Sequence, residues 1–411
     1  CSVPSKSAAT VARCTEVVAE LAKKARYGPG SAQTAVSYLK LFDRDSILRH
    51  PEHPRAGGAE IHVARIFGRL AARGFDVTWL ATSFVGGASR TTLDGIKIER
   101  RGPLPLYYAS LPGRVRRATA KAIRGGDNRT NGSYGTGSSG CDLVVECLNK
   151  IPFYSPLYAN APTLALCHHL FGTVAFDQAS WPVAAGVVAS ELGLSRAYRH
   201  VPFLAISEST ACDLTARGIG PAHMTISPPG IDPRSFEVDP NAMRPPRITY
   251  VGRLEPYKRV DVMLRAGARL VDRFPDLELL VIGKGSDRQR LENLSRGLGL
   301  AGRTRLTGFI EDGERDALLA GTRACAFPSE KEGWGLTVIE ANALGTPVVA
   351  RDAPGLRDSV RHGQTGTLVG PPEQHDPDLY YLAIKSRYLQ KKTKNNLTFK
   401  GDYYFFLVLV F

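Results

Sequence analysis

Short apolar runs alternate with amphipathic segments along residues 247–350, and this alternation constrains the fold more than any other feature of the sequence. The apolar runs are short and bounded by turn residues, which favours buried strands, whereas the segments between them carry apolar residues at helical spacing. Strands that alternate with helices predict a parallel sheet covered on both faces. The predicted strands are 247–251, 278–282, 324–327 and 347–350, and the predicted helices are 260–274, 287–298 and 336–344.

A second series of this kind precedes residue 227. A helix is predicted to open at Gly57 and Gly58 and to close at Gly74, and strands are predicted at 75–82, 142–146, 163–168 and 203–206. Prolines interrupt residues 227–246 and break both helix and strand. We therefore predict an α/β protein with two doubly wound domains facing each other across a cleft. The predicted parts are an N-terminal extension (1–40), an N-terminal domain (41–228), a linker (229–246), a C-terminal domain (247–372) and an atypical tail (373–411).

Composition narrows the choice of partners. The net charge of +14 suits an anionic ligand or surface. No helix-turn-helix signal, zinc-finger spacing or aromatic RNA-binding motif accompanies it, so no nucleic-acid partner is predicted. The seven cysteines include no Cys-x-x-Cys pair, which favours a reducing cytoplasm over a disulfide framework. A short basic helix at 113–124 leaves contact with an anionic membrane open, although a solvated helix face is the preferred interpretation.

Two cations follow the first strand of the C-terminal series. Arg253 and Lys258 lie on a strand-to-helix turn, where Arg binds a diphosphate through two hydrogen bonds and Lys as a point charge. The alternative is a solvated basic loop. Gly283 follows the next strand in a Gly-x-Gly turn, which permits close approach of the backbone to a ligand and is equally expected of a structural turn.

The most informative segment is residues 327–340. Gly333 and Gly335 keep a turn open after a strand, and a helix is predicted to begin near Trp334 to Leu336. The free N–H groups of such a helix end favour an anion such as a diphosphate. Glu332 precedes this end and Glu340 lies about one turn inside the helix, so their carboxylates are placed to accept hydrogen bonds from hydroxyl groups. Glu340 stands in an otherwise apolar helix, where a carboxylate needs a partner.

In these residues the chain resembles glycosyltransferase family 4, whose members are retaining enzymes of the GT-B fold. The resemblance covers about residues 55–372. It rests on the Gly57–Gly58 turn with Glu60, on Gly252 and Arg253 with Lys258, and on Glu332 with seven residues before Glu340; Gly345–Ala350 and Gly363–Gly366 extend it.

The resemblance implies that the protein transfers a sugar from a nucleoside-diphosphate sugar, without a metal or other cofactor. The Gly57–Gly58 backbone, Arg253 and Lys258 would hold the diphosphate. Glu332 would bind the transferred sugar, Glu340 the ribose, and the backbone at Phe309 and Ile310 would lie beside the base.

A histidine is also expected at the site. The family often has His-Asp at the end of the strand predicted at 163–168, and here the residues are His168 and His169, of which the register favours His168. Its expected role is contact with the donor sugar or the leaving group. The departing phosphate oxygen can itself accept the acceptor's proton, so no separate base is assigned.

Residues 146–153 and Trp181 are expected near the acceptor. The tail after Pro372 does not match the C-terminal helix that, in the family, crosses back to the N-terminal domain.

Two alternatives stay open at this point, and a third is not supported. A non-hydrolysing nucleotide-sugar epimerase would use the same fold and donor without an acceptor. A degenerate transferase would bind a nucleotide without turnover. A NAD-dependent dehydrogenase requires Gly-x-Gly-x-x-Gly after a strand with a later acidic residue, and the sequence lacks that set. The nucleotide, the sugar, the acceptor and the oligomeric state cannot be read from the sequence.

Overall fold

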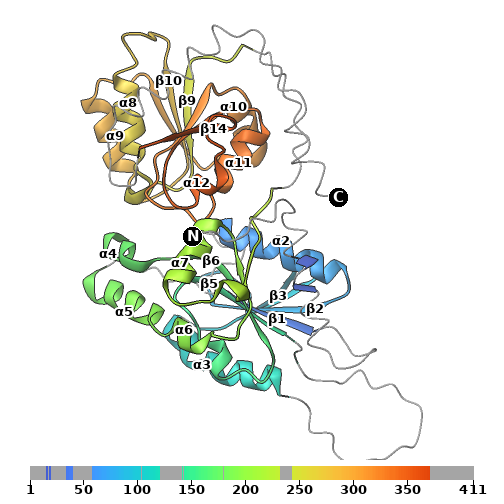
Figure 1. Cartoon of the computed structure of the whole chain (residues 1–411). Helices are drawn as coiled ribbons and strands as arrows, with labels where there is room; N and C mark the ends of the chain where they lie inside the picture. The colour runs from blue at the N-terminus through green and yellow to red at the C-terminus, as the bar shows by residue number, and fades with distance from the viewer. Residues whose placement is uncertain are drawn as a thin grey trace, which may run out of the picture. The chain divides into compact units, whose positions relative to one another are not determined.

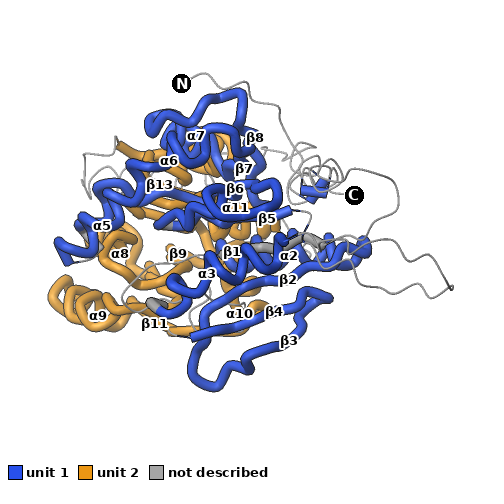
Figure 2. Tube along the Cα trace, turned by 90° about the horizontal axis from the view of Figure 1, so that it is seen from below, with its two compact units in different colours: residues 1–229 blue, residues 230–411 orange. Residues whose placement is uncertain are grey.

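A computed structural model describes residues 15–16, 18–19, 34–39, 58–102, 104–120, 141, 143–178, 180–231 and 243–370. The chain divides into two compact units, Cys1–Pro229 and Gly230–Phe411 (Figures 1 and 2). The division falls at the start of the proline-rich segment that was predicted as a linker.

The second unit is a six-stranded parallel sheet in the order β11-β10-β9-β12-β13-β14. Its strands are β9 (Arg247–Val251), β10 (Glu278–Ile282), β11 (Thr304–Gly308), β12 (Ala324–Phe327), β13 (Val348–Arg351) and β14 (Gly366–Val369). The strands build outward from β9 in one direction and from β12 in the other. Ligands in such sheets bind beyond the strand ends where the order reverses, and here that place lies between β9 and β12.

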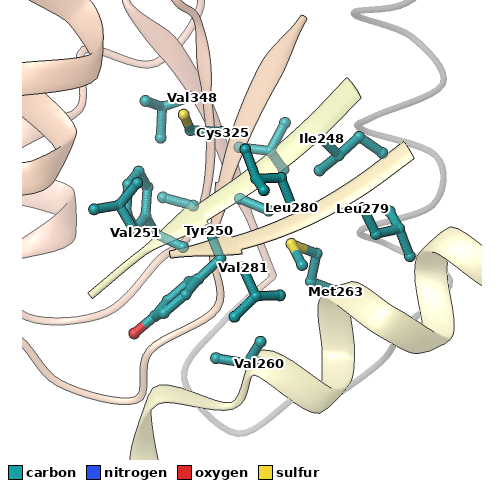
Figure 3. Close-up of a cluster of buried hydrophobic side chains, with 14 of the residues drawn as sticks. Ile248, Tyr250, Val251, Val260, Met263, Leu279, Leu280, Val281, Cys325 and Val348 are labelled. Carbon is teal, nitrogen blue, oxygen red and sulfur yellow. The ribbon is translucent and has the colours of Figure 1, made fainter. Parts of the chain in front are cut away.

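Helices cover both faces of this sheet, with α8 and α9 on one face and α10, α11 and α12 on the other (Figure 1). They are α8 (Val260–Ala268), α9 (Arg288–Gly297), α10 (Asp312–Ala320), α11 (Leu336–Ala343) and α12 (Leu356–Ser359). Figure 3 shows Val260 and Met263 of α8 directed toward Val281 and Leu279 of β10, all four buried in one core cluster. Because both faces of the sheet are covered, β9, β10, β12 and β13 are mostly apolar runs, which is why the sequence indicated these four strands. It did not indicate β11 and β14, which include polar residues or glycine.

The first unit holds an eight-stranded sheet in the order β3-β4-β2-β1-β5-β6-β7-β8, in which only the β3–β4 pairing is antiparallel. Its strands are β1 (Thr34–Leu39), β2 (Asp76–Ala81), β3 (Arg90–Leu93), β4 (Ile96–Arg100), β5 (Leu143–Lys150), β6 (Thr163–Leu170), β7 (Phe203–Ala205) and β8 (Met224–Ile226). Its helices are α2 (Gly58–Ala72), α3 (Leu104–Thr119), α4 (Ala175–Gln178), α5 (Trp181–Glu191), α6 (Leu194–Ala197) and α7 (Glu208–Ala216).

Two predictions for this unit were wrong. Residues 1–40 are not wholly an extension, because β1 pairs with β2 on one side and β5 on the other, at the centre of the sheet. The basic helix predicted at 113–124 is the second half of α3, which continues through Pro112. It is not simply a solvated face, since Arg114 is buried and pairs with Glu99 of β4 at 3.2 Å.

Some predictions lie outside the described residues. They concern Gly57, most of the linker and the tail at 373–411. Among the helices that the structure does describe, none is long and apolar enough to cross a bilayer.

Candidate functional site

The loop after β9 carries the two predicted cations in different settings. A short 3₁₀ turn, Pro256–Lys258, ends at Arg259, whose backbone is left-handed, and this bend turns Lys258 inward until its residue is only 8% exposed. Arg253 lies on the exposed side, with its Nη2 3.5 Å from the hydroxyl of Tyr257. The loop therefore offers one buried and one exposed positive charge.

Lys258 and Glu332 form an ion pair. Strands β9 and β12 are adjacent and parallel, so the loops that follow them leave the same edge of the sheet. The Nζ of Lys258 lies 2.5 Å from Oε1 of Glu332, and both side chains are mostly buried. Burial on its own lowers the pKa of Lys258, but the charge and hydrogen bond of Glu332, together with the nearby Tyr257, outweigh it, so the net pKa is raised and the lysine is charged. The structure thus brings together two residues that the sequence singled out separately.

A second loop, which contains Pro354 and Gly355, packs against the backbone of Glu332. The Glu332 amide donates to the carbonyl of Pro354 at 3.0 Å. Gly355 has a left-handed φ of 81°, and a Cβ added to it would overlap the Glu332 carbonyl oxygen. Only glycine fits both the backbone angle and the contact. Gly355 did not emerge from the sequence, although its place after Ala353 and Pro354 is a turn signal.

The rest of the 327–340 segment leads into α11. Gly333, Trp334, Gly335 and Leu336 are all partly buried, and α11 begins at Leu336. The first N–H groups of this helix point toward the end of the sheet from which the Lys258 loop also leaves. A helix N-terminus and an ammonium group on one sheet edge together favour an anionic ligand.

Glu340 lies on α11, as predicted, and is partly buried. Its partner is the charge of Arg315 on α10. Burial lowers the pKa of Arg315, whereas the carboxylates around it raise it, with Glu340 the largest of these influences, and the net pKa is raised. Arg315 was not predicted, because it is 25 positions from Glu340 and belongs to a helix that the sequence did not indicate.

The glycine turn after β10 is explained by packing. A Cβ on Gly283 would overlap the backbone carbonyl of Gly252, so the glycine permits the loops after β9 and β10 to touch. This favours the structural interpretation of Gly283. Farther along the edge, Phe309 is 66% exposed, and Nζ of Lys284 lies 5.5 Å from the centre of its ring. Ile310 packs partly into the core.

In the first unit, His168 is buried beside another histidine. His168 lies near the end of β6, and its Nε2 is 3.3 Å from Nδ1 of His62 on α2. Each residue is 2% exposed. Burial lowers the pKa of His168 to about 4, and burial together with the charges of His168 and Arg65 lowers the pKa of His62 well below its usual value. Both imidazoles are therefore neutral near pH 7. The sequence indicated His168 and missed His62, which lies four residues after Gly58.

His169 points elsewhere, with its ring 4.9 Å from that of Phe171. The backbone that follows is fixed by Glu191, whose Oε1 accepts hydrogen bonds from the amides of Phe171 and Gly172. The other oxygen of Glu191 pairs with Arg217 at 2.7 Å. This buried carboxylate holds the loop after β6 in place.

Glu146, which was expected near the acceptor, has a structural explanation instead. It is fully buried on β5, and its two oxygens accept hydrogen bonds from the Phe153 amide, from the Tyr198 hydroxyl and from both the amide and the hydroxyl of Ser155. All of its acceptor positions are thereby used within the fold. Trp181, by contrast, is 73% exposed at the start of α5.

Comparisons with known proteins identify the family of the chain. The model of Glycosyltransferase Family 4 matches residues 56–235, and that of Glycosyl transferases group 1 matches residues 232–398. The chain is 31% identical over 352 residues to D-inositol 3-phosphate glycosyltransferase of Actinosynnema mirum, with 79% of this chain and 82% of that protein covered. It is 29% identical to the protein of the same name from Rhodococcus jostii, over 83% of this chain and 79% of that protein.

Solved structures show the same fold. Sucrose-phosphate synthase from Thermosynechococcus elongatus matches with a TM-score of 0.64 at 20% identity, covering 88% of this chain and 91% of that one. The Anabaena protein HepE in complex with UDP-glucose matches with a TM-score of 0.60 at 17% identity, covering 87% and 90%.

The fold is therefore that of the GT-B glycosyltransferases, with two Rossmann-like units. The chain belongs to glycosyltransferase family 4 and is an enzyme that transfers glycosyl groups.

Proposed function

We propose that the donor is a nucleoside-diphosphate sugar and that the sugar is transferred with retention of its anomeric configuration. The observation that carries this proposal is the Lys258–Glu332 pair at the edge where β9 and β12 meet. Lys258, Arg253 and the N-terminus of α11 together supply positive charge for a diphosphate, and the exposed Gly58 at the start of α2 is assigned to the same diphosphate. Glu332 supplies an acceptor for sugar hydroxyls directly beside this charge.

The remaining roles are those that the family resemblance implies. Glu340, held by the charge of Arg315, accepts from the ribose hydroxyls. Phe309 and Ile310 lie beside the base. His168 donates a hydrogen bond toward the donor sugar or the leaving group. The departing diphosphate accepts the proton of the acceptor hydroxyl, and its growing negative charge is stabilised by Lys258 and Arg253. No metal ion is needed for that stabilisation, since the side chains provide the charge.

The names of the sequence relatives suggest the first acceptor to try. They are called D-inositol 3-phosphate glycosyltransferases, and we propose a small hydroxylated acceptor of that kind. Retention is proposed because the family resemblance implies it.

The experiment is a donor panel. The protein is incubated with UDP-, GDP-, ADP- and TDP-sugars, with D-inositol 3-phosphate and without it, in the presence of EDTA, and release of nucleoside diphosphate is measured. We expect acceptor-dependent release from one of these donors, undiminished by EDTA, and a product whose anomeric configuration by NMR matches that of the donor.

Lys258→Ala and Glu340→Ala are each expected to lower turnover by about 100-fold or more while the circular dichroism stays native. Wild-type turnover by either variant would contradict the role assigned to that residue, and an inverted product would contradict retention.

A further inference from the structure

The buried pair of His62 and His168 has hydrogen-bonding groups that the proposed function does not use. Both rings are almost wholly enclosed, and they meet nearly at right angles with their centres 5.5 Å apart. Each ring has a second nitrogen, Nε2 of His62 and Nδ1 of His168, that is buried and has no hydrogen-bond partner among the described residues. A neutral imidazole carries one N–H and one lone pair, so each of these two nitrogens is either an unused donor or an unused acceptor.

The shared hydrogen bond links the states of the two rings. If Nδ1 of His62 donates, Nε2 of His168 is the acceptor, and the proton of His168 must be on its Nδ1. If Nε2 of His168 donates to Nδ1 of His62 instead, Nδ1 of His168 has no proton and can only accept a hydrogen bond. The partner of one ring nitrogen decides which tautomer the ring adopts, so His62 determines whether His168 offers a donor or an acceptor at its outer nitrogen.

We propose that His62 is a positioning residue for His168: its Nδ1–H donates to Nε2 of His168, which fixes the ring and leaves an N–H at Nδ1 of His168 for the donor substrate. This inference rests on the role proposed above for His168. The direction of the bond follows from the chemistry of transfer, because an N–H stabilises the oxygen of a sugar or a departing phosphate, whereas a lone pair would repel it.

The elements that carry the two rings support this arrangement. His62 is in the first two turns of α2, which begins at Gly58, and His168 is near the end of β6. The hydroxyl of Thr210 on α7 donates to the backbone carbonyl of His168 at 3.3 Å, and Glu191 holds the amides of Phe171 and Gly172 just beyond. The backbone of His168 is therefore held by other residues, and among the described residues the hydrogen bond to its ring comes from His62.

The test compares His62→Asn, His62→Gln and His62→Leu. The Asn amide can place a donor where Nδ1 of histidine lies, whereas Gln places its amide one bond farther and Leu has no donor. With the donor that the panel identifies, we expect His62→Leu and His62→Gln to lose about tenfold or more in kcat, as the loss of an orienting partner of a functional histidine usually causes. KM for the donor should stay within about twofold, and His62→Asn should keep kcat within about threefold of the wild type.

Two further measurements separate positioning from mere packing. In a His168→Ala background, His62→Leu should cause no further loss of kcat, because the two residues act as one unit. In ¹⁵N-histidine NMR spectra of the wild type, His168 should be a single tautomer protonated at Nδ1, and this signature should be lost in His62→Leu but kept in His62→Asn. The NMR measurement needs no turnover, and so it judges the pair even if none of the donors in the panel is used.

Wild-type kcat in His62→Leu, additive losses in the double variant, or a His168 tautomer protonated at Nε2 would each overturn the inference. Wild-type turnover in His168→Ala would overturn the role of His168 and this inference with it, while leaving the donor assignment that rests on Lys258 and Glu332 intact.

Discussion

At the scale of single residues, the Lys258–Glu332 pair leads to a stability prediction that does not depend on catalysis. Both side chains are mostly buried, with 11% and 19% of their surfaces exposed. Removing one partner from such a pair leaves an uncompensated charge, whereas removing both does not. We expect Lys258→Met to lower the free energy of unfolding by about 1–3 kcal/mol, less than for a fully buried pair, and a second change, Glu332→Gln, to restore part of that loss.

Urea unfolding without nucleotide measures this effect. Arg253→Met is the matched control, because Arg253 lies on the same loop but is exposed, and it should change stability little. A double variant less stable than Lys258→Met would mean that the pair does not act as a unit.

How far the sequence predicts the site is clearest at these same residues. Lys258, Glu332 and His168 stand out because their residue types follow strands, and parallel strands end at one edge. Their partners do not stand out. Glu332 is 74 positions from Lys258, and His62 is 106 positions from His168. Because the partners are so far apart in the sequence, no local sequence pattern predicts either contact. Glu146 was expected near the acceptor, but its carboxylate lies within β5 and is occupied by donors of the fold: Phe153 and Ser155, seven and nine positions on, and Tyr198, 52 positions on.

At the scale of elements, the contact between Gly355 and the loop of Glu332 gives a sharper test. Gly355 and Gly363 both have φ near 81°, but a Cβ on Gly363 meets nothing within 4 Å, whereas one on Gly355 would overlap Glu332. Each change to alanine carries the strain of a left-handed backbone, about 1 kcal/mol. Only Gly355→Ala also displaces the loop that carries the carboxylate.

We therefore expect Gly355→Ala to lower turnover by about tenfold or more, since small displacements of reacting groups are costly, while Gly363→Ala retains nearly wild-type turnover. Steady-state kinetics and thermal unfolding of both variants check this. Equal losses of turnover would indicate that the contact with Glu332 is unimportant.

The elements also show where sequence reasoning works. Strands β9, β10 and β12 match the predicted residues, because they are covered on both faces and read as uninterrupted apolar runs. The hairpin β3–β4 lies at the edge of its sheet, and β3 alternates exposed with partly buried residues, so the sequence did not indicate it. Helix α3 begins at Leu104 and continues through Pro112, so the helix predicted at 113–124 was placed too far along the chain.

At the scale of the whole molecule, the histidine pair makes the stability depend on pH. A histidine in the unfolded chain takes up a proton near pH 6.5, whereas folded His168 does so near pH 4. Between these values the unfolded chain binds more protons than the folded chain, so the free energy of unfolding falls as the pH falls. His168 alone accounts for a loss of about 2 kcal/mol between pH 7 and pH 5, and His62 adds to it.

Denaturant unfolding at several pH values between 7 and 5 tests this. His168→Asn should remove about 2 kcal/mol of the pH-dependent loss, and the same change at the exposed His223 should leave the loss unaltered. If the free energy of unfolding of His168→Asn changed with pH as steeply as that of the wild type, the ring of His168 would not become buried and neutral on folding.

The reversal of strand order between β9 and β12 has a consequence for how such enzymes diversify. After β9 the chain places Lys258, then forms α8, β10, α9, β11 and α10, and returns through β12 to place Glu332 beside Lys258. Phe309, the residue proposed to lie beside the nucleotide base, belongs to this excursion and is therefore separate in sequence from Lys258 and Glu332. Under the roles proposed here, we expect substitutions in this excursion to change which nucleotide is accepted while the contacts of Lys258 and Glu332 with the diphosphate and the sugar are kept.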